Sequence, residues 1–191
     1  GGSTAMLINA SDVAGATYLT LWRINNPTGT NPTIARTTIQ GVWPYDYPAS
    51  APQPETHILI DTGQSSILKA VNREGIIYTA QNVKFTDVPS SVVYTRINTA
   101  ADQVTLQARW IEGHFFYPAF DVPATFGPVN AFPNKFIVGT TTDALGNITY
   151  PGFREVKAGA AAYELTSNDR TARWGDYFGG AIDPQLGGLW V

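Results

Sequence analysis

The sequence of 191 residues contains no cysteine. This absence excludes structural disulfides, thiolate catalysis and zinc sites with cysteine ligands. It leaves the redox compartment open, because the usual marker of an oxidising compartment is the disulfide itself.

Charged residues are also scarce, at 14% of the chain. The 12 Lys+Arg and 15 Asp+Glu give a formal net charge of −3, and the basic residues are scattered singly. A nucleic-acid site needs basic residues gathered on one face, because they must neutralise a row of phosphates. We therefore expect no nucleic-acid partner.

Long apolar runs are absent as well. A helix needs about 20 apolar residues to cross a bilayer, whereas the longest apolar runs here are short, such as Ile76-Ile77-Tyr78. We expect no membrane span. No basic and then apolar signal segment opens the sequence, which begins Gly1-Gly2-Ser3-Thr4. We therefore expect that a signal has been removed or that this is an interior segment.

Strand formers and turn formers fill the sequence instead. It holds 18 glycines and 13 prolines, and 12% of its residues are aromatic. Segments rich in β-branched and aromatic residues alternate with polar positions and end in turn residues, a pattern typical of strands. They cover residues 16–24, 33–39, 66–71, 75–80, 91–97, 103–110 and 135–139. The sequence predicts an all-β fold.

Turns and one helix complete the local prediction. Asn72–Gly75 and Asp143–Asn147 are predicted hairpin turns, in which glycine accepts a positive φ. The best helical segment is Glu155–Leu165, although Gly159 interrupts it.

An internal repeat with an offset of about 70 residues organises these strands. Leu21-Trp-Arg-Ile-Asn25 matches Tyr94-Thr-Arg-Ile-Asn98, and Tyr47-Pro-Ala49 matches Tyr117-Pro-Ala119. Four strand segments between Ser65 and Gly113 have the content of one four-stranded antiparallel propeller blade. We predict about three blades of a β-propeller in a single domain: a half blade at 1–48, a blade at 49–113, an irregular blade at 114–172 and a half blade at 173–191.

The C-terminal region resembles a known family. Arg173-Trp-Gly-Asp-Tyr177, Ala181-Ile-Asp-Pro184 and Leu189-Trp-Val191 are similar to the R-W-G-D-Y…D-P…W-V signature of large secreted bacterial β-propeller proteins. Those proteins are distant relatives of sialidase-like propellers with Asp-box (BNR) repeats, and most have no assigned activity. The resemblance implies a propeller fold and a secreted or cell-surface bacterial protein.

The sialidase Asp-box itself is only approximated. Residues 141–150 follow the pattern S-x-D-x-G-x-T-W with one residue too many between Asp143 and Gly146. The departure does not support sialidase activity.

Carboxylates are the catalytic candidates, because glycoside hydrolysis uses an acid and a base or nucleophile at a defined separation. We single out Asp61, Asp143 and Asp176, and for each a turn-forming role is the structural alternative. A carbohydrate-active hydrolase is therefore the second functional hypothesis, and we lean against an enzyme.

Four arginines lie beside strand aromatics, namely Arg23, Arg96, Arg109 and Arg173. Three convergent arginines could bind a carboxylate, but stacking on neighbouring rings such as Trp22, Trp110 and Trp174 is the preferred interpretation.

Aromatic loops give the first functional hypothesis, a module that binds a glycan or a protein. The expected ligand-binding residues are Trp43, Tyr45, Tyr47, Phe116, Tyr117, Arg173, Trp174 and Asp176. Space-filling between blades is the alternative for most of these rings.

No cofactor is predicted. Calcium is the one candidate ion, at Asp143 and Asn147, but their loop lacks the alternating oxygens of a dedicated calcium site. Half blades at both ends would expose unpaired strand edges. We therefore expect them to pair with blades from a second copy, from a partner chain or from a further part of the same polypeptide.

Overall fold

The computed structural model describes residues 3–85, 90–110, 114–117, 120–123, 132–133, 135–137, 141–143, 148–149, 154–165, 171–173, 181–182 and 189–190. All regular structure within these ranges is β-strand, and none of it is helix. The predicted all-β class is confirmed. No helix long and apolar enough to cross a membrane occurs among the described residues.

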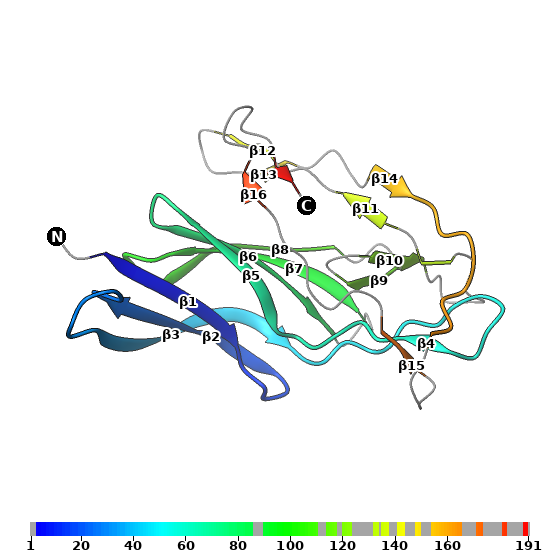
Figure 1. Cartoon of the computed structure of the whole chain (residues 1–191), viewed down its shortest axis with the longest axis horizontal. Helices are drawn as coiled ribbons and strands as arrows, with labels where there is room; N and C mark the ends of the chain where they lie inside the picture. The colour runs from blue at the N-terminus through cyan, green and yellow to red at the C-terminus, as the bar shows by residue number, and fades with distance from the viewer. Residues whose placement is uncertain are drawn as a thin grey trace.

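Two antiparallel sheets form most of the described structure (Figure 1). One has three strands in the order β1-β2-β3, and the other has four in the order β5-β6-β7-β8. Their bounds are β1 Thr4–Ala10, β2 Ala16–Asn25, β3 Thr33–Tyr45, β5 Ile67–Arg73, β6 Ile76–Val83, β7 Ser91–Asn98 and β8 Gln103–Trp110.

The remaining strands are short and pair two by two. They are β4 Leu59–Ile60, β9 His114–Tyr117, β10 Phe120–Pro123, β11 Lys135–Ile137, β12 Thr141–Thr142, β13 Ile148–Thr149, β14 Arg154–Lys157, β15 Thr171–Ala172, β16 Ala181–Ile182 and β17 Leu189–Trp190. The pairs are β9 with β10, β11 with β14, β12 with β13, β16 with β17, and β4 with β15. The last of these is parallel, which the sequence did not predict.

The three-stranded sheet contains both strands predicted before Pro48, as β2 and β3. It also contains β1, which was not predicted. The sequence of β1 does not alternate apolar with polar residues, because Leu7 on its exposed face is apolar, like Met6 and Ile8, which pack against the core. The N-terminal unit is thus larger than the expected two strands.

The four-stranded sheet follows the chain in order and confirms the four strand segments predicted there. The β5–β6 turn has Glu74 at φ 53° and Gly75 at φ 79°. Positive φ at both central residues of a two-residue turn matches the right-handed twist of the flanking strands. The hairpin predicted at 72–75 is confirmed. The second predicted turn, at 143–147, lies mostly outside the described residues.

The core lies between these two sheets. Leu19, Leu21 and Ile39 face it from the three-stranded sheet, and Ile77 and Ile97 face it from the four-stranded one. Each such side chain contributes roughly 1.5–3 kcal/mol through removal from water. Burial therefore holds the sheets face to face.

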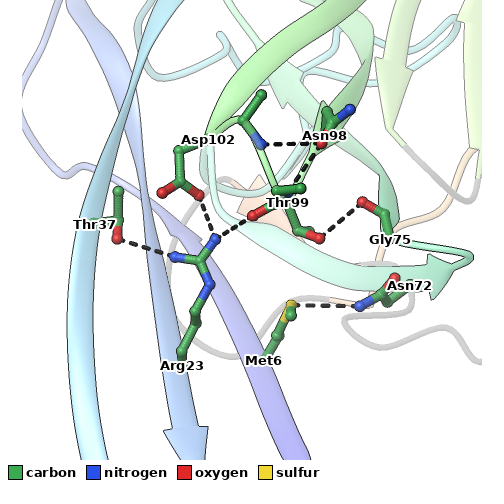
Figure 2. Close-up of polar contacts among 10 residues, drawn as sticks. Met6, Arg23, Thr37, Asn72, Gly75, Asn98, Thr99 and Asp102 are labelled. Carbon is green, nitrogen blue, oxygen red and sulfur yellow. Dashed lines mark hydrogen bonds and ion pairs between the residues drawn. The ribbon is translucent and has the colours of Figure 1, made fainter.

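A polar seam closes one end of this interface (Figure 2). Arg23 of β2 forms an ion pair with Asp102 in the β7–β8 turn and also donates to the Thr99 carbonyl. Its other nitrogen donates to Thr37 Oγ1 at 3.0 Å. The turn is shaped by Asn98, whose side-chain oxygen accepts the N–H groups of residues 100 and 101. One arginine therefore connects both sheets.

The helix predicted over Glu155–Leu165 is wrong. Residues 154–157 form β14, and 158–165 have no regular structure. Gly159 lies so close to the Pro133 carbonyl and Phe132 that there is no room for a Cβ atom. This backbone contact, rather than local propensity, determines the conformation of the segment.

The same segment is fixed to the chain near residue 53. The Gln53 side-chain amide donates to the carbonyls of Ile58 and Tyr163, both at 2.9 Å, and its oxygen accepts the Tyr163 N–H at 2.7 Å. Nearby, the Asp61 N–H donates to the Ala172 carbonyl at 2.8 Å beside the β4–β15 pair. These bonds connect the later part of the chain to the connector before the four-stranded sheet.

Candidate functional site

A four-residue bulge near the C-terminal end of β3 exposes a tryptophan. Ala16 pairs with Tyr45 and Tyr18 pairs with Gln40, so the single residue Thr17 lies opposite residues 41–44. Gly41, at φ 81°, allows the bend. Bulges of this kind redirect side chains and are common beside functional sites. Trp43 lies in this bulge and is 41% exposed.

The backbone of Trp43 is hydrogen-bonded to the four-stranded sheet, and its ring packs against the loop that follows β6. The Trp43 N–H donates to Gln107 Oε1 at 2.8 Å, and Gln107 Nε2 donates to Thr95 Oγ1 at 3.1 Å. The Trp43 and Phe85 rings meet edge to face, with centroids 6.3 Å apart. The Arg109 guanidinium carbon lies 4.7 Å from the Phe85 centroid. We call Trp43, Phe85, Gln107 and Arg109 the Trp43 cluster.

Tyr45, expected to bind ligand, is instead a core residue that is 2% exposed. Its hydroxyl accepts the Ser11 N–H at 2.7 Å and donates to the Tyr18 carbonyl at 2.8 Å. Burial raises the pKa of the phenol above its ordinary value. The predicted strand ended at residue 39, whereas β3 continues through the bulge to Tyr45, and its buried residues are Ile39, Val42 and Tyr45.

Tyr47 follows this strand and is 42% exposed. Its hydroxyl donates to the Asp12 carbonyl at 3.3 Å, and its N–H donates to the Asp46 carboxylate at 2.7 Å. Asp46 also forms a β-bridge with Lys84, the residue before Phe85. Tyr47 is therefore an exposed, anchored ring joined by this bridge to the Phe85 end of the Trp43 cluster.

Asp61 is the one catalytic candidate whose surroundings are described in detail. Its carboxylate accepts the Gly63 N–H at 2.8 Å, and Gly63 has a φ of 76°. This is the turn geometry given as the structural alternative. Asp143 is exposed beside β12. Asp176 and Asn147 lie outside the described residues.

The other expected ligand residues are only partly described. Phe116 and Tyr117 lie in β9, whose backbone alone is described. Arg173 is exposed directly after β15, and Trp174 lies outside the described residues.

Arginine stacking occurs, but in pairs that differ from the predicted neighbours in sequence. Arg96 lies 5.6 Å from the Tyr78 ring centroid, and Arg109 stacks on Phe85 at 4.7 Å from its centroid. The side chain of Trp110 is outside the described part of the structure. Trp22 is covered by Arg36 at 5.7 Å, its cross-strand neighbour, while Arg23 forms the ion pair to Asp102. Two of these three pairs, Arg96 with Tyr78 and Arg36 with Trp22, are cross-strand neighbours, and none of the three joins residues adjacent in the sequence.

Sequence reasoning missed Phe85 and Gln107 and assigned Arg109 another partner. The available signal was that Lys84 and Phe85 follow closely after the predicted strand 75–80. This position places them in the connection to the next predicted strand. What could not be seen was that this connection lies against the β3 bulge.

No group of three or more histidine or acidic side chains that could hold a metal ion is found in the described part of the chain. Comparison with family models, with curated proteins and with solved structures finds no match to this chain. The geometry of the Trp43 cluster is therefore what supports a functional assignment.

Proposed function

We propose that this protein is a binding module that recognises a glycan on the Trp43 cluster. The observation that carries the proposal is the exposed indole of Trp43, whose backbone is bonded to Gln107 and whose ring packs against Phe85. Such a ring offers an apolar face at little entropic cost, because it is ordered before binding.

The chemistry around the ring suits a sugar. Aromatic rings pack against apolar C–H groups, while nearby amide and charged groups can orient hydroxyls. Here an amide (Gln107), a guanidinium (Arg109) and an ammonium (Lys84) all lie on the elements that contact Trp43 or adjoin Phe85. Tyr47 adds a second exposed ring close in sequence.

A glycan array followed by titration calorimetry on any positive glycan tests this function. We expect Trp43→Ala to weaken binding at least about tenfold, as aromatic anchors do, and Trp43→Phe to retain most of it. Leu165→Ala, which trims an exposed apolar side chain that is not part of the Trp43 cluster, is the control. Binding that is unaffected in Trp43→Ala, or an array with no positive glycan, contradicts the proposal. Capture of a defined protein ligand sensitive to Trp43→Ala would favour protein recognition instead.

For the fold, we propose that the two sheets are neighbouring units of a β-propeller. A four-stranded antiparallel sheet whose strands follow the chain in order, packed face to face on a second sheet, supports this. The division at 1–48, 49–113, 114–172 and 173–191 and the secreted or cell-surface location belong to the same proposal. Closing a ring would need blades from a second copy, a partner chain or a further part of the polypeptide. Electron microscopy of the assembled particle should show a central channel; a compact two-layer particle without one would contradict it.

The hydrolase alternative keeps Asp143 and Asp176 as its carboxylates, because Asp61 is engaged in a turn. Hydrolysis of fluorogenic glycosides that is lost in a folded Asp176→Asn variant would establish it in place of simple binding.

A further inference from the structure

The outer edge of β3 is an exposed strand edge. Among the described residues, β3 pairs with β2 on one side only, because the sheet order is β1-β2-β3. Residues 33–36, 38 and 40–41 are all exposed, and Ile34 is 67% exposed. An edge of this length is a template for another strand.

The register identifies which peptide groups lie on that edge. Asn26 N–H donates to the Ser3 carbonyl, next to the Thr4–Asn25 pair, so even-numbered residues of β2 bond to β1. Hydrogen-bonding direction alternates along an antiparallel strand, so odd-numbered residues of β2 bond to their odd-numbered partners on β3. The backbone N–H and C=O groups of Ile34, Arg36, Thr38 and Gln40 therefore point away from the sheet.

Edge strands are usually protected from pairing by proline, bulges or charged side chains, and these features do not block residues 34–40. Pro32 precedes it and the Gly41 bulge follows it, so both lie outside the segment 34–40. Its one charged residue, Arg36, stacks on Trp22 of its own sheet at 5.7 Å from the ring centroid. A charge folded back in this way does not project from the edge.

We infer that a second copy of this chain pairs here, β3 against β3 in antiparallel orientation, about a two-fold axis at Thr37. Thr37 is the midpoint of the open segment 34–40, so this register uses all four outward residues. Ile34 then pairs with Gln40 of the second copy and Arg36 with Thr38 of the second copy, and each pair exchanges two hydrogen bonds. Two three-stranded sheets become one continuous sheet.

Charge and packing favour this register over its neighbours. An axis at Arg36 would set two arginines directly opposite each other, which is destabilising. An axis at Thr37 instead sets Arg36 opposite a neutral threonine and places two threonines side by side, a favourable cross-strand pair. An axis moved further toward either end would run the ladder into Pro32 or into the Gly41 bulge. A second copy is thus a self-complementary occupant, as an isologous interface requires.

Light scattering on the purified chain over a range of concentrations gives the first test. We expect a concentration-dependent dimer, and a Thr38→Pro variant should shift it toward monomer. Proline is tolerated on an edge strand where its missing N–H faced outward, so the variant should keep the far-ultraviolet circular dichroism and unfolding cooperativity of the wild type. A wild type that is monomeric at every concentration overturns the inference.

Disulfide trapping gives the position of the axis. Because the chain has no cysteine, Thr37→Cys introduces a single thiol. Opposed residues in this register are close enough for a disulfide, at about 4.5 Å between Cα atoms. Ala35→Cys is the matched control on the same strand and the same face, but its symmetry mate is roughly 13 Å further along the ladder. Rapid covalent dimer from Thr37→Cys alone supports the inference; equal rates from both variants overturn it.

Charge variants at Thr38 test the pairing itself. Thr38→Arg places a cation opposite Arg36 of the second copy twice by symmetry and should weaken the dimer by roughly 2- to 30-fold. Thr38→Glu should tighten it by a similar factor. Both effects should shrink at high salt. If neither substitution changes the affinity of the dimer, the dimer uses another surface, such as the C-terminal strands, and the proposed site is overturned.

Discussion

The Arg23 guanidinium on β2 reaches across the sheet interface to the Asp102 carboxylate in the turn between β7 and β8. The two side chains are 20% and 35% exposed, so the pair is only partly screened by water. Arg23 also donates to Thr37 and to the Thr99 carbonyl, so its removal leaves several acceptors without a donor.

Arg23→Ala should therefore lower the free energy of unfolding by about 1–3 kcal/mol. Urea denaturation measures it, with Arg73→Ala at an exposed arginine of β5 as the control, expected to change stability by no more than about 0.5 kcal/mol. A double-mutant cycle with Asp102→Ala isolates the ion pair. Equal effects of Arg23→Ala and Arg73→Ala would show that the seam contributes nothing.

Stability should fall in alkali because of two tyrosines. Burial raises the pKa of Tyr45 and of Tyr94, and the Ser11 N–H and Arg96 respectively oppose this only in part. The folded state thus holds both phenols neutral more tightly than the unfolded chain does. The stabilisation is complete below the ordinary tyrosine pKa of about 10 and is lost as pH rises through the folded pKa.

Denaturation from pH 8 to pH 12 checks this expectation. Tyr45→Phe should start from lower stability, because it gives up two hydrogen bonds, yet lose less as pH rises. A wild type and a Tyr45→Phe variant with parallel pH profiles would contradict the assignment of alkaline sensitivity to Tyr45.

The β3 bulge should depend on Gly41. Its φ of 81° is unfavourable for residues with a Cβ, although no atom lies within 4 Å of where one would be. Gly41→Ala should therefore cost about 1–2 kcal/mol from backbone strain alone. Gly41→Asn should cost less, since asparagine tolerates this region better.

Thermal unfolding measures both variants, and Thr17→Ala, opposite the bulge, is a control that should be near neutral. If Gly41→Ala proved as stable as wild type, the positive φ would not be needed to display Trp43.

Gln53 should hold residues 158–165 in place. Gln53→Ala removes three hydrogen bonds, two of them to Tyr163, and should speed cleavage after Glu164 by a glutamate-specific protease. Gln53→Glu retains the acceptor but loses both donated bonds, so an intermediate rate is expected. Gln64→Ala, at an exposed glutamine of the same connector, is the control. Cleavage that is no faster in Gln53→Ala than in Gln64→Ala would contradict this role.

Local patterns predicted the strands better than they predicted the site. The alternation in Gln103–Trp110 gave β8 with both bounds correct, and the Gly75 turn followed from its residue types. Tyr45 was misplaced because the predicted strand ended at residue 39 and left Tyr45 in a loop, whereas β3 continues to Tyr45. The bulge of residues 41–44 could not be predicted either, since one glycine does not indicate how many residues bulge. Phe85 and Gln107 could not be assigned, since they reach Trp43 only when the two sheets pack.

The parallel contact between β4 and β15 joins residues more than a hundred positions apart, as does the bond from Gln53 to Tyr163, separated by 110. Closing such a loop costs roughly 3 kcal/mol more than closing a tight hairpin, because the cost rises with each doubling of length. Only a short ladder of hydrogen bonds offsets this loop-closure cost, because β4 and β15 are two residues each. Hairpins such as β5–β6 can form in microseconds, so we expect this long-range contact to be among the last to form in folding and the first to open. Native-state hydrogen exchange should accordingly find the Asp61 amide far less protected than amides of β6 and β7.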